Sequence, residues 1–226
     1  MKECLKAPQS EPNALELVEK HTTIPASRLV DVGQYDGKTY MIMTVLPGEQ
    51  LESVYHLMSY EECDRLAEDL GDCVAQLRRI PNNTPYRFAN TAGGPIYDHL
   101  LPDEEPVGPY NNESDFNNHL LGYIDCTPEE AFQSNGENRS MCQDHQSYFT
   151  HGDLHSTNII MQNGRLSGIV DWECAGYMPD YWECIKARRA SWSSPVLWAI
   201  YGPVFKRFGD YEEEWEIERI LWRHTH

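Results

Sequence analysis

The spacing of apolar positions predicts a short N-terminal part that mixes helix and strands. In SEPNALELVEKHT, Ala14, Leu15 and Val18 fall on one helical face, and Ser10 stands where a helix cap is expected. Two β-rich runs then flank the dipeptide Asp36-Gly37, which predicts a hairpin. Its second run, 40–46, stops at a Pro-Gly pair, so the first unit of the fold ends there.

The rest of the chain has mostly helical periodicity. Ser59 and Glu62 have the spacing of a capping box, and apolar residues recur after them at helical intervals: Cys63, Leu66, Ala67, Leu70, Val74 and Leu77. Further helices are predicted from Ser114, from Thr127, over 179–198 and over 211–223. Residues 82–109 are rich in Pro, Gly, Asn and Asp and are predicted to be mostly loop. We therefore expect an α+β protein of two lobes, 1–46 and 47–226, with a hinge at 44–48 and a ligand cleft between the lobes.

One hairpin interrupts the helical part and carries polar residues at its open end. Asn163-Gly164 predicts a two-residue turn, which sets Gln162 opposite Arg165 and Asn158 opposite Ile169. Asp171 then lies on the same face as Asn158, about 7–8 Å away at the backbone. An amide and a carboxylate oxygen are hard ligands that suit Mg²⁺. Asp153 precedes this hairpin in a loop at the same end, where it could act as a base or orient a substrate.

Composition narrows the possible partners. The 226-residue chain has 40% apolar residues and a formal net charge of −18, which argues against duplex nucleic acid or an anionic membrane as partner. No apolar run has the length of a membrane span, no signal peptide is recognised, and the seven cysteines form no CxxC pair. We expect a cytoplasmic protein with reduced thiols.

The motifs HGDLHSTN and GIVDWECAGYMPDYWE together resemble the aminoglycoside phosphotransferase family, in particular its fungal branch. The segments HTTIPASRLVDV, YMIMTVLPGEQL, AGGPIYDHL and GPYNNESDFNNHLL resemble other parts of the same family. The resemblance implies a protein-kinase-like two-lobed fold with a mostly helical C-lobe. It also implies ATP-dependent phosphorylation of a hydroxyl on a small molecule. The loop 82–109 and the C-terminal helices should line the substrate pocket, where acidic residues would favour a cationic acceptor.

The resemblance assigns roles to single residues. Asp153 would be the catalytic base and His151 would orient the catalytic loop. Asn158 and Asp171 would hold Mg²⁺ against the phosphates of ATP. Backbone groups of Thr44, Val45 and Leu46 would bind the adenine, and Glu11 would pair with a lysine on a strand.

The N-terminus departs from the family pattern. Only ten residues precede Glu11, so Lys2 and Lys6 are the candidates for the strand lysine, and neither is predicted to lie in a strand. No Gly-rich phosphate loop is recognised. We expect a reduced N-lobe sheet and weak ATP binding. The alternative is a pseudoenzyme or binding module of the same fold without ATP turnover.

A second alternative belongs to another class of protein. His145, His151, His155 and Asp153 could bind zinc in a hydrolase, although their spacing matches no helix-borne zinc motif.

Overall fold

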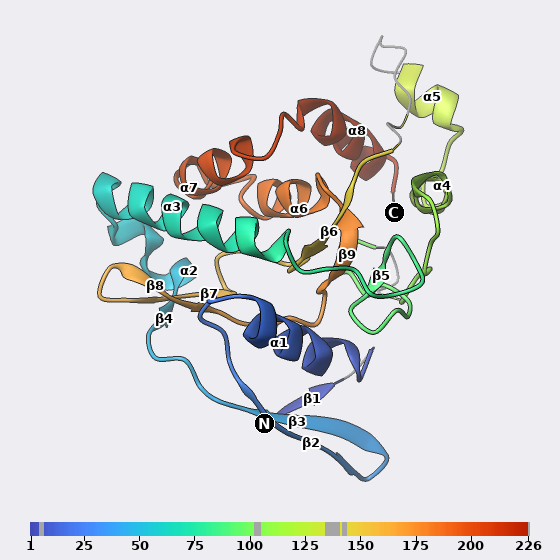
Figure 1. Cartoon of the computed structure of the whole chain (residues 1–226). Coiled ribbons are helices and arrows are strands. Elements are labelled where there is room, and N and C mark those ends of the chain that lie inside the picture. The colour runs from blue at the N-terminus through green and yellow to red at the C-terminus, as the bar shows by residue number, and fades with distance from the viewer. Residues whose placement is uncertain (5–6, 102–104, 134–140, 142–143, 226) are drawn as a thin grey trace.

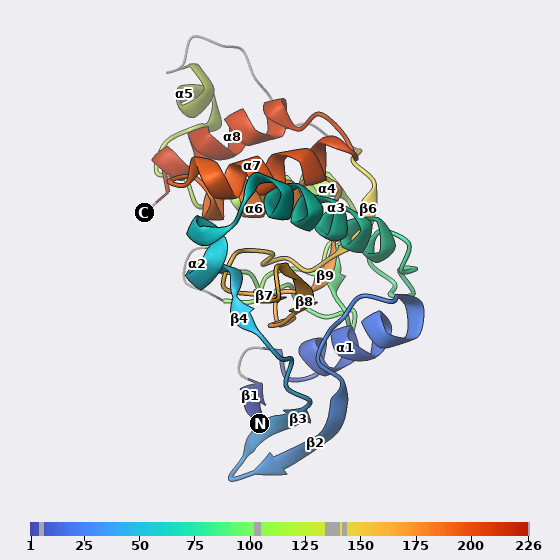
Figure 2. The same cartoon turned by 90° about the vertical axis from the view of Figure 1, so that its left-hand side faces the viewer.

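The computed structural model describes residues 1–4, 7–101, 105–133, 141 and 144–225. Within these residues the strands form three small antiparallel sheets, with the orders β1-β3-β2, β4-β7-β8 and β5-β9-β6. Figures 1 and 2 show the first sheet at one end of the molecule and helices α5, α7 and α8 at the other. The hairpin β7–β8 lies between these two ends in both views. In the described part of the chain no helix is both long and apolar enough to cross a membrane.

The N-terminal sheet contains β1 (Lys2–Cys4), β2 (Leu29–Tyr35) and β3 (Lys38–Met43). The predicted hairpin turn is confirmed, and both its residues, Asp36 and Gly37, have positive φ angles of 49° and 73°. Strand β1 corrects one expectation, because Lys2 does lie on a strand and pairs with Met41. Three residues are too short a run for alternation to predict. Lys6, the other candidate, lies outside the described residues.

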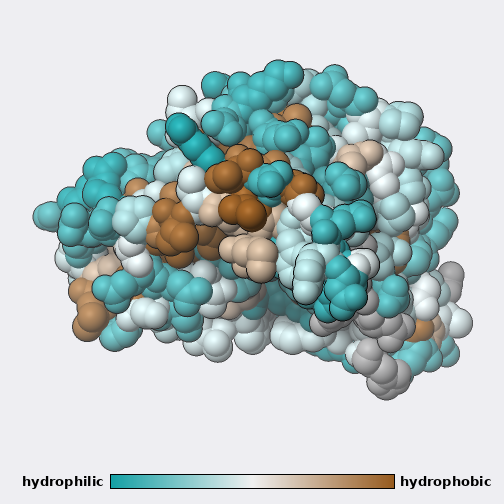
Figure 3. All heavy atoms as spheres, turned by 90° about the horizontal axis from the view of Figure 1, so that it is seen from below, coloured by the Kyte–Doolittle hydropathy of each residue, from teal (hydrophilic) through white to brown (hydrophobic). Residues whose placement is uncertain are grey.

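The outer face of this sheet carries apolar side chains that no described residue covers. Figure 3 shows apolar atoms gathered on the lower side of the molecule, where the N-terminal sheet lies. Tyr35 and Ile42 on β2 and β3 are exposed on this face, as is Met1 next to them. The sheet therefore buries Met41 and Cys4 on its inner face, while β2 is exposed along almost its whole length.

Helix α1 (Ser10–His21) forms as predicted and buries Ala14, Leu15 and Val18. Ser10 is not its cap: it is the first helical residue, and its side-chain oxygen lies 3.3 Å from Oγ1 of Thr91. The hydroxyl thus joins the start of the helix to the loop that contains Thr91.

The helical part follows the predicted pattern, with changes at the helix ends. The capping box on α3 (Tyr60–Leu77) is present, and α3 packs along α7 (Pro195–Lys206). The single helix predicted over 179–198 is wrong: α6 (Trp182–Ala190) ends, and α7 restarts at Pro195 with Ser194 as its cap. Proline lacks an N–H and suits a first turn, which explains the break. The remaining helices are α2 (Leu51–Val54), a 3₁₀ turn (Tyr55–Leu57), α4 (Glu113–Leu121), α5 (Pro128–Gln133) and α8 (Glu212–Arg223).

The central hairpin is made by β7 (Ile159–Gln162) and β8 (Arg165–Ile169), and β4 (Glu49–Gln50) pairs with β7. Gln162 faces Arg165 as predicted, but the register shifts between Ile160 and Met161. Ile159 then faces Ile169, so the predicted pairing of Asn158 with Ile169 is wrong. The bulge adds one residue on β8, which the sequence does not reveal.

A third sheet was not predicted. It joins β5 (Ala89–Asn90), β9 (Gly176–Pro179) and β6 (Ser147–Thr150), and it delivers the chain from β6 into the loop that carries Asp153. The cysteines that the structure describes are all free, and most of them are buried; Cys142 lies outside the described residues.

Candidate active site

The turn between β6 and β7 carries Asp153 and is held by hydrogen bonds with His151 and Glu183. His151 is fully buried, its Nε2 donates to the carbonyl of Val170 at 2.9 Å, and its Nδ1 accepts from the backbone N–H of Asp153 at 3.1 Å. Its ring lies edge-on to Trp172 at 4.6 Å. Burial lowers the pKa of His151 to about 4, so the ring is neutral at pH 7. The two hydrogen bonds of His151 join the backbone of Asp153 to that of Val170.

Glu183 holds the same turn from the other side. Its buried carboxylate accepts from the backbone N–H of His151 at 2.6 Å and of Gly152 at 3.2 Å. Gly152 has a φ of 77°, and a Cβ there would lie 2.3 Å from the carbonyl oxygen of Cys174. Burial raises the pKa of Glu183 to about 7 against these two hydrogen bonds. Sequence reasoning missed Glu183, since a glutamate in a helix has no distinctive signal.

Asp153 is an ionised carboxylate with fixed neighbours. Its Oδ2 lies 3.2 Å from Nε2 of His155 and accepts from Nδ2 of Asn158 at 3.0 Å. Burial disfavours the charge, but the contact with His155 and the nearby Lys186 outweigh it and lower the pKa of Asp153 to about 2. The side chain therefore offers hydrogen-bond acceptors and no proton at pH 7.

Asn158 and Asp171 come together in a way that differs from the prediction. Beyond the bulge, the N–H of Val170 donates to the carbonyl of Asn158, so Asp171 is not the diagonal neighbour expected from a regular ladder. Asp171 lies two residues beyond the end of β8. Its φ is positive, at 64°, a conformation that Asp tolerates better than most residues. The predicted geometry is wrong even though both residues lie at the open end of the hairpin.

Lys2 gathers the acidic residues of this region. Its Nζ lies 2.8 Å from Glu11, 2.5 Å from Asp171 and 3.0 Å from Glu173. Burial opposes the charge of Lys2, but the carboxylates raise its pKa. Burial and the two other carboxylates raise the pKa of Glu11 to about 7 despite Lys2. Oxygens of the three carboxylates lie within 4.8 Å of one another, so the cluster is a cation site that the ammonium fills.

The segment 82–109 borders the candidate site on the side of Glu173. His99 Nε2 lies 3.3 Å from Glu173, and the contact raises the pKa of His99 while it lowers that of Glu173. Next to it, the buried carboxylate of Asp98 pairs with Lys186 and accepts from the indole of Trp182 at 2.9 Å. Sequence reasoning missed these pairs, because their partners are far apart along the chain.

The donors at the open end of the hairpin fit a hard divalent cation. Both hydrogen bonds from Nδ2 of Asn158 go to Asp153, and its amide oxygen lies on the other side, where the hydroxyl of Thr157 approaches it at 3.5 Å. The side chain of Asp171 is 40% exposed and Glu173 is its neighbour in the Lys2 cluster. Carboxylate and amide oxygens are the ligands that Mg²⁺ takes.

The segment predicted to bind adenine runs in extended chain past the end of β3. The N–H of Thr44 donates to the carbonyl of Arg28 at 3.0 Å, and its hydroxyl accepts from the N–H of Arg28 at 2.8 Å. The side chain of Val45 is 91% exposed, and Leu46 lies against Gly168 of the hairpin.

The zinc-hydrolase alternative is wrong. His145 lies between Glu113 and Glu214, at 2.7 and 3.2 Å, and its imidazole stacks edge-on against Tyr181. Among the described residues, neither group of three potential metal ligands includes any of the proposed histidines. The Nε2 of His151 is already bonded to a backbone carbonyl.

Comparisons with known proteins identify the family and the fold of this chain. The profile of the Phosphotransferase enzyme family (APH) matches residues 9–219. No curated protein matches the chain. Among solved structures, an aminoglycoside-3'-phosphotransferase of type VIII aligns with a TM-score of 0.55 at 14% identity, over 96% of this chain and 80% of that one.

Two further solved structures have the same fold. The aminoglycoside phosphotransferase APH(3'')-Id from Streptomyces rimosus, in complex with ADP and streptomycin, aligns at a TM-score of 0.54 and 16% identity over 99% of this chain and 85% of that one. The macrolide 2'-phosphotransferase MphH from Brachybacterium faecium aligns at 0.54 and 15% over 94% and 72%. These likenesses confirm the predicted α+β, kinase-like fold class.

Proposed function

Because the chain belongs to the phosphotransferase enzyme family, we propose that it transfers the γ-phosphoryl group of ATP to a hydroxyl of a small molecule. The observation that carries this proposal is the amide of Asn158. Its nitrogen donates to Asp153, an ionised carboxylate, and its oxygen meets the hydroxyl of Thr157 at 3.5 Å, a contact long enough to give way to a cation.

Asp153 is the group that meets the acceptor. With a pKa of about 2, Asp153 is a weak base in the ground state. We therefore assign it the role of accepting a hydrogen bond from the acceptor hydroxyl and orienting that hydroxyl toward the phosphoryl group. In a loose phosphoryl-transfer transition state the hydroxyl proton leaves late, and positioning contributes most of the rate. His151 and Glu183 serve that positioning by fixing the backbone of the turn.

Asn158 and Asp171 would hold Mg²⁺, which would neutralise charge on the phosphates of bound ATP. Glu173 stands beside Asp171 and already shares its cation, Lys2. It is therefore the next available oxygen ligand in the Lys2 cluster.

Lys2 and Glu11 form an ion pair that would position the bound nucleotide. Lys2 lies on β1 and Glu11 on α1, so their contact joins the N-terminal sheet to the helix. The Lys2 ammonium would bind the α- and β-phosphates. Backbone groups of Thr44, Val45 and Leu46 would form hydrogen bonds with the adenine. We place the division between lobes at 44–48, with 1–46 in the nucleotide-binding lobe. Without a Gly-rich loop over the phosphates, ATP binding by this chain would be weak.

The acceptor that we propose is a small molecule that carries a hydroxyl group. Solved relatives are named for aminoglycosides and a macrolide, which are small molecules with hydroxyls. The wall formed by His99 and Glu173 would border this molecule, and the acidity of the region would favour a cationic acceptor.

A binding module without ATP turnover is the second candidate. The 2.5 Å contact between Lys2 and Asp171 favours it, because the ammonium lies on the carboxylate that a metal would need. In an active enzyme this contact must give way when ATP and Mg²⁺ bind.

Three substitutions test the assignment through nucleotide titration and phosphate transfer. Asp171→Ala should abolish Mg²⁺-dependent nucleotide binding, and Asn158→Ala should weaken it less, because water can replace a neutral amide oxygen. Asp153→Asn should leave nucleotide binding nearly intact and lower turnover by about 10²–10⁴-fold.

The outcomes separate the two candidates. Nucleotide binding without phosphate transfer to any hydroxyl compound tried would favour the binding module. If Asp153→Asn weakens nucleotide binding as much as Asp171→Ala does, the roles assigned here are wrong.

A further inference from the structure

A second cluster of potential metal ligands lies where the C-terminal end of the chain meets the connection between α4 and α5. The backbone fixes these two segments against each other. The N–H of Asp125 donates to the carbonyl of His224 at 3.0 Å, and Ile124 forms an isolated antiparallel bridge with Thr225. Residues on either side of the cluster are therefore held by main-chain contacts.

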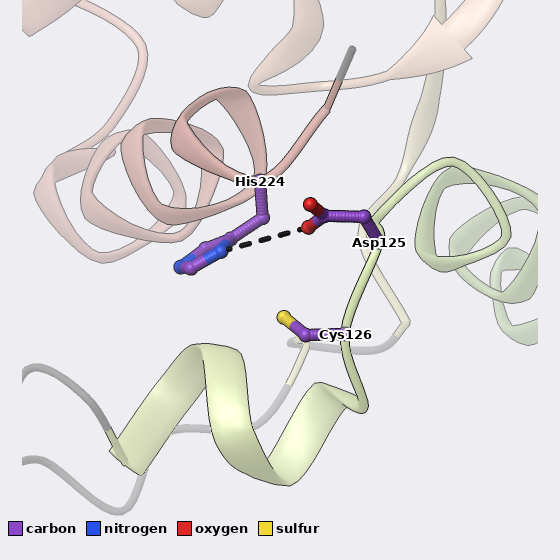
Figure 4. A group of neighbouring side chains, drawn as sticks. All are labelled: Asp125, Cys126 and His224. Atoms are coloured by element: carbon purple, nitrogen blue, oxygen red, sulfur yellow. Dashed lines mark ion pairs between the residues drawn. The ribbon is translucent and has the colours of Figure 1, made fainter.

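Three different donor atoms converge there. One carboxylate oxygen of Asp125, the sulfur of Cys126 and one ring nitrogen of His224 all lie within 4.8 Å of one another. The distance from Oδ1 of Asp125 to Nδ1 of His224 is 3.9 Å. Figure 4 shows the carboxylate and the sulfur, from adjacent residues of one loop, both turned toward the imidazole.

This spacing is close to that of a tetrahedral metal site. Zinc bonds of about 2.0–2.3 Å to oxygen, nitrogen and sulfur place the donor atoms roughly 3.3–3.8 Å from one another. The donors at this cluster would need to approach by at most about 1.5 Å, which side-chain rotation can supply while the backbone contacts stay in place. An ion pair alone would need only Asp125 and His224, so it does not account for the thiol of Cys126 in the same cluster.

We propose that Asp125, Cys126 and His224 bind one Zn²⁺ ion, with water as the fourth ligand. A thiolate and an imidazole are poor ligands for Mg²⁺ or Ca²⁺ and good ones for zinc, which also takes a carboxylate. The site lies at the α5 end of the molecule, away from the N-terminal sheet that carries Lys2 (Figures 1 and 2).

The position of the cluster suggests what the metal does. Beside it lies a small apolar core that is separate from the main one and contains five buried residues: Ala131, Phe132, Ile217, Ile220 and Leu221. Cys126 packs against this core, and α5 contacts α8 through it. A core of this size contributes little stability, so a metal that joins the α4–α5 connection to the end of α8 would hold α5 in place.

Cobalt titration of the full chain tests the proposal. Co²⁺ bound through a thiolate gives a near-ultraviolet charge-transfer band, whereas the oxygen ligands around Asp171 give none. Cys126→Ser should abolish the band. Asp125→Asn and His224→Gln should weaken Zn²⁺ binding, measured by competition with Co²⁺, by more than about 100-fold, since outer-shell changes alone cost about 10–100-fold.

Matched controls come from outside the cluster. Cys63 is a half-buried free cysteine and His56 is an exposed histidine, so Cys63→Ser and His56→Gln should leave the band unchanged. At 100 times its dissociation constant, Zn²⁺ should raise Tm of the wild type by roughly 5–10 °C.

Absence of the band in the wild type, or its survival in Cys126→Ser, would overturn the proposal. If Cys126→Ser does not fold, alkylation of the wild type decides the question by peptide mapping. Zn²⁺ should protect Cys126 from iodoacetamide and leave Cys63 unprotected. Equal alkylation of Cys126 with and without Zn²⁺ would show that the thiol is not a ligand.

Discussion

Gly152 is the position where the conformation of the turn that carries Asp153 can be tested most directly. Its φ of 77° favours glycine, and a Cβ there would lie 2.3 Å from the carbonyl oxygen of Cys174. Ordinary contact begins near 3.4 Å, so Gly152→Ala must push the turn away from Cys174 by about 1 Å. Gly37 is a matched control, since its φ is 73° and a Cβ there would meet nothing within 4 Å.

The two substitutions share one cost and differ in another. An alanine with positive φ costs about 1–2 kcal/mol, of which about 0.4–1 is recovered because the unfolded chain loses freedom. Gly37→Ala should therefore destabilise the protein by about 1 kcal/mol. Gly152→Ala adds an overpacking cost of about 1–3 kcal/mol against a backbone atom, for a total of roughly 2–4 kcal/mol.

Function should respond as well, because Gly152 precedes Asp153. A shift of 1 Å in a catalytic group can lower a rate by about 10²-fold, so turnover should fall far more than nucleotide affinity. Urea unfolding gives the stability difference, and phosphate transfer by the folded fraction gives the rate. If Gly152→Ala and Gly37→Ala destabilise equally, the close approach to Cys174 is not present in solution.

Three further predictions concern charged residues that lie in ion pairs. Asp98→Asn or Lys186→Met should destabilise the protein by about 3–5 kcal/mol in urea unfolding, because each leaves a buried charge unpaired; Asp98→Leu combined with Lys186→Met should recover much of the loss. Burial opposes the charge of His145, but Glu113 and Glu214 raise its pKa to about 10, above the unfolded value of 6.5. The charged His145 therefore stabilises the protein fully below pH 6.5, and this contribution is lost progressively as the pH rises to about 10. Tm of the wild type should fall over this range, and it should fall less in His145→Gln. Lys2→Met should weaken ATP·Mg binding in calorimetry, while Mg²⁺ alone should raise Tm more in the variant than in the wild type, because three clustered carboxylates lose their ammonium.

Patterns that depend on near neighbours in the chain were predictable. The capping box at Ser59, the turns at Asp36-Gly37 and Asn163-Gly164, and the apolar face of α1 each involve residues a few positions apart, and the structure has all of them. The break between α6 and α7 was missed although Pro195 marks it, because the apolar spacing continues on both sides.

Features that depend on contacts across the chain were not predictable. The bulge in β8 changes which residue faces Asn158, and the positive φ of Asp171 redirects its side chain. Both follow from packing of the hairpin against other segments, such as the hydrogen bond from Ile169 to Pro25. The partners of Glu183 and Asp98 are likewise set by the fold.

The charges in the candidate active site constrain the form in which a nucleotide can bind. Glu11, Asp171 and Glu173 surround the single ammonium of Lys2, and Asp153 adds a further ionised carboxylate nearby. The polyphosphate of ATP would meet a net negative site, and repulsion at short range in a partly buried region costs more than in water. Asp171 would hold a divalent cation there, which would offset that repulsion and free Lys2 from Asp171. The proposed activity therefore requires that ATP bind much more weakly when the nucleotide titration is run with EDTA in place of Mg²⁺; equal affinity in the two conditions would place the phosphates away from this cluster.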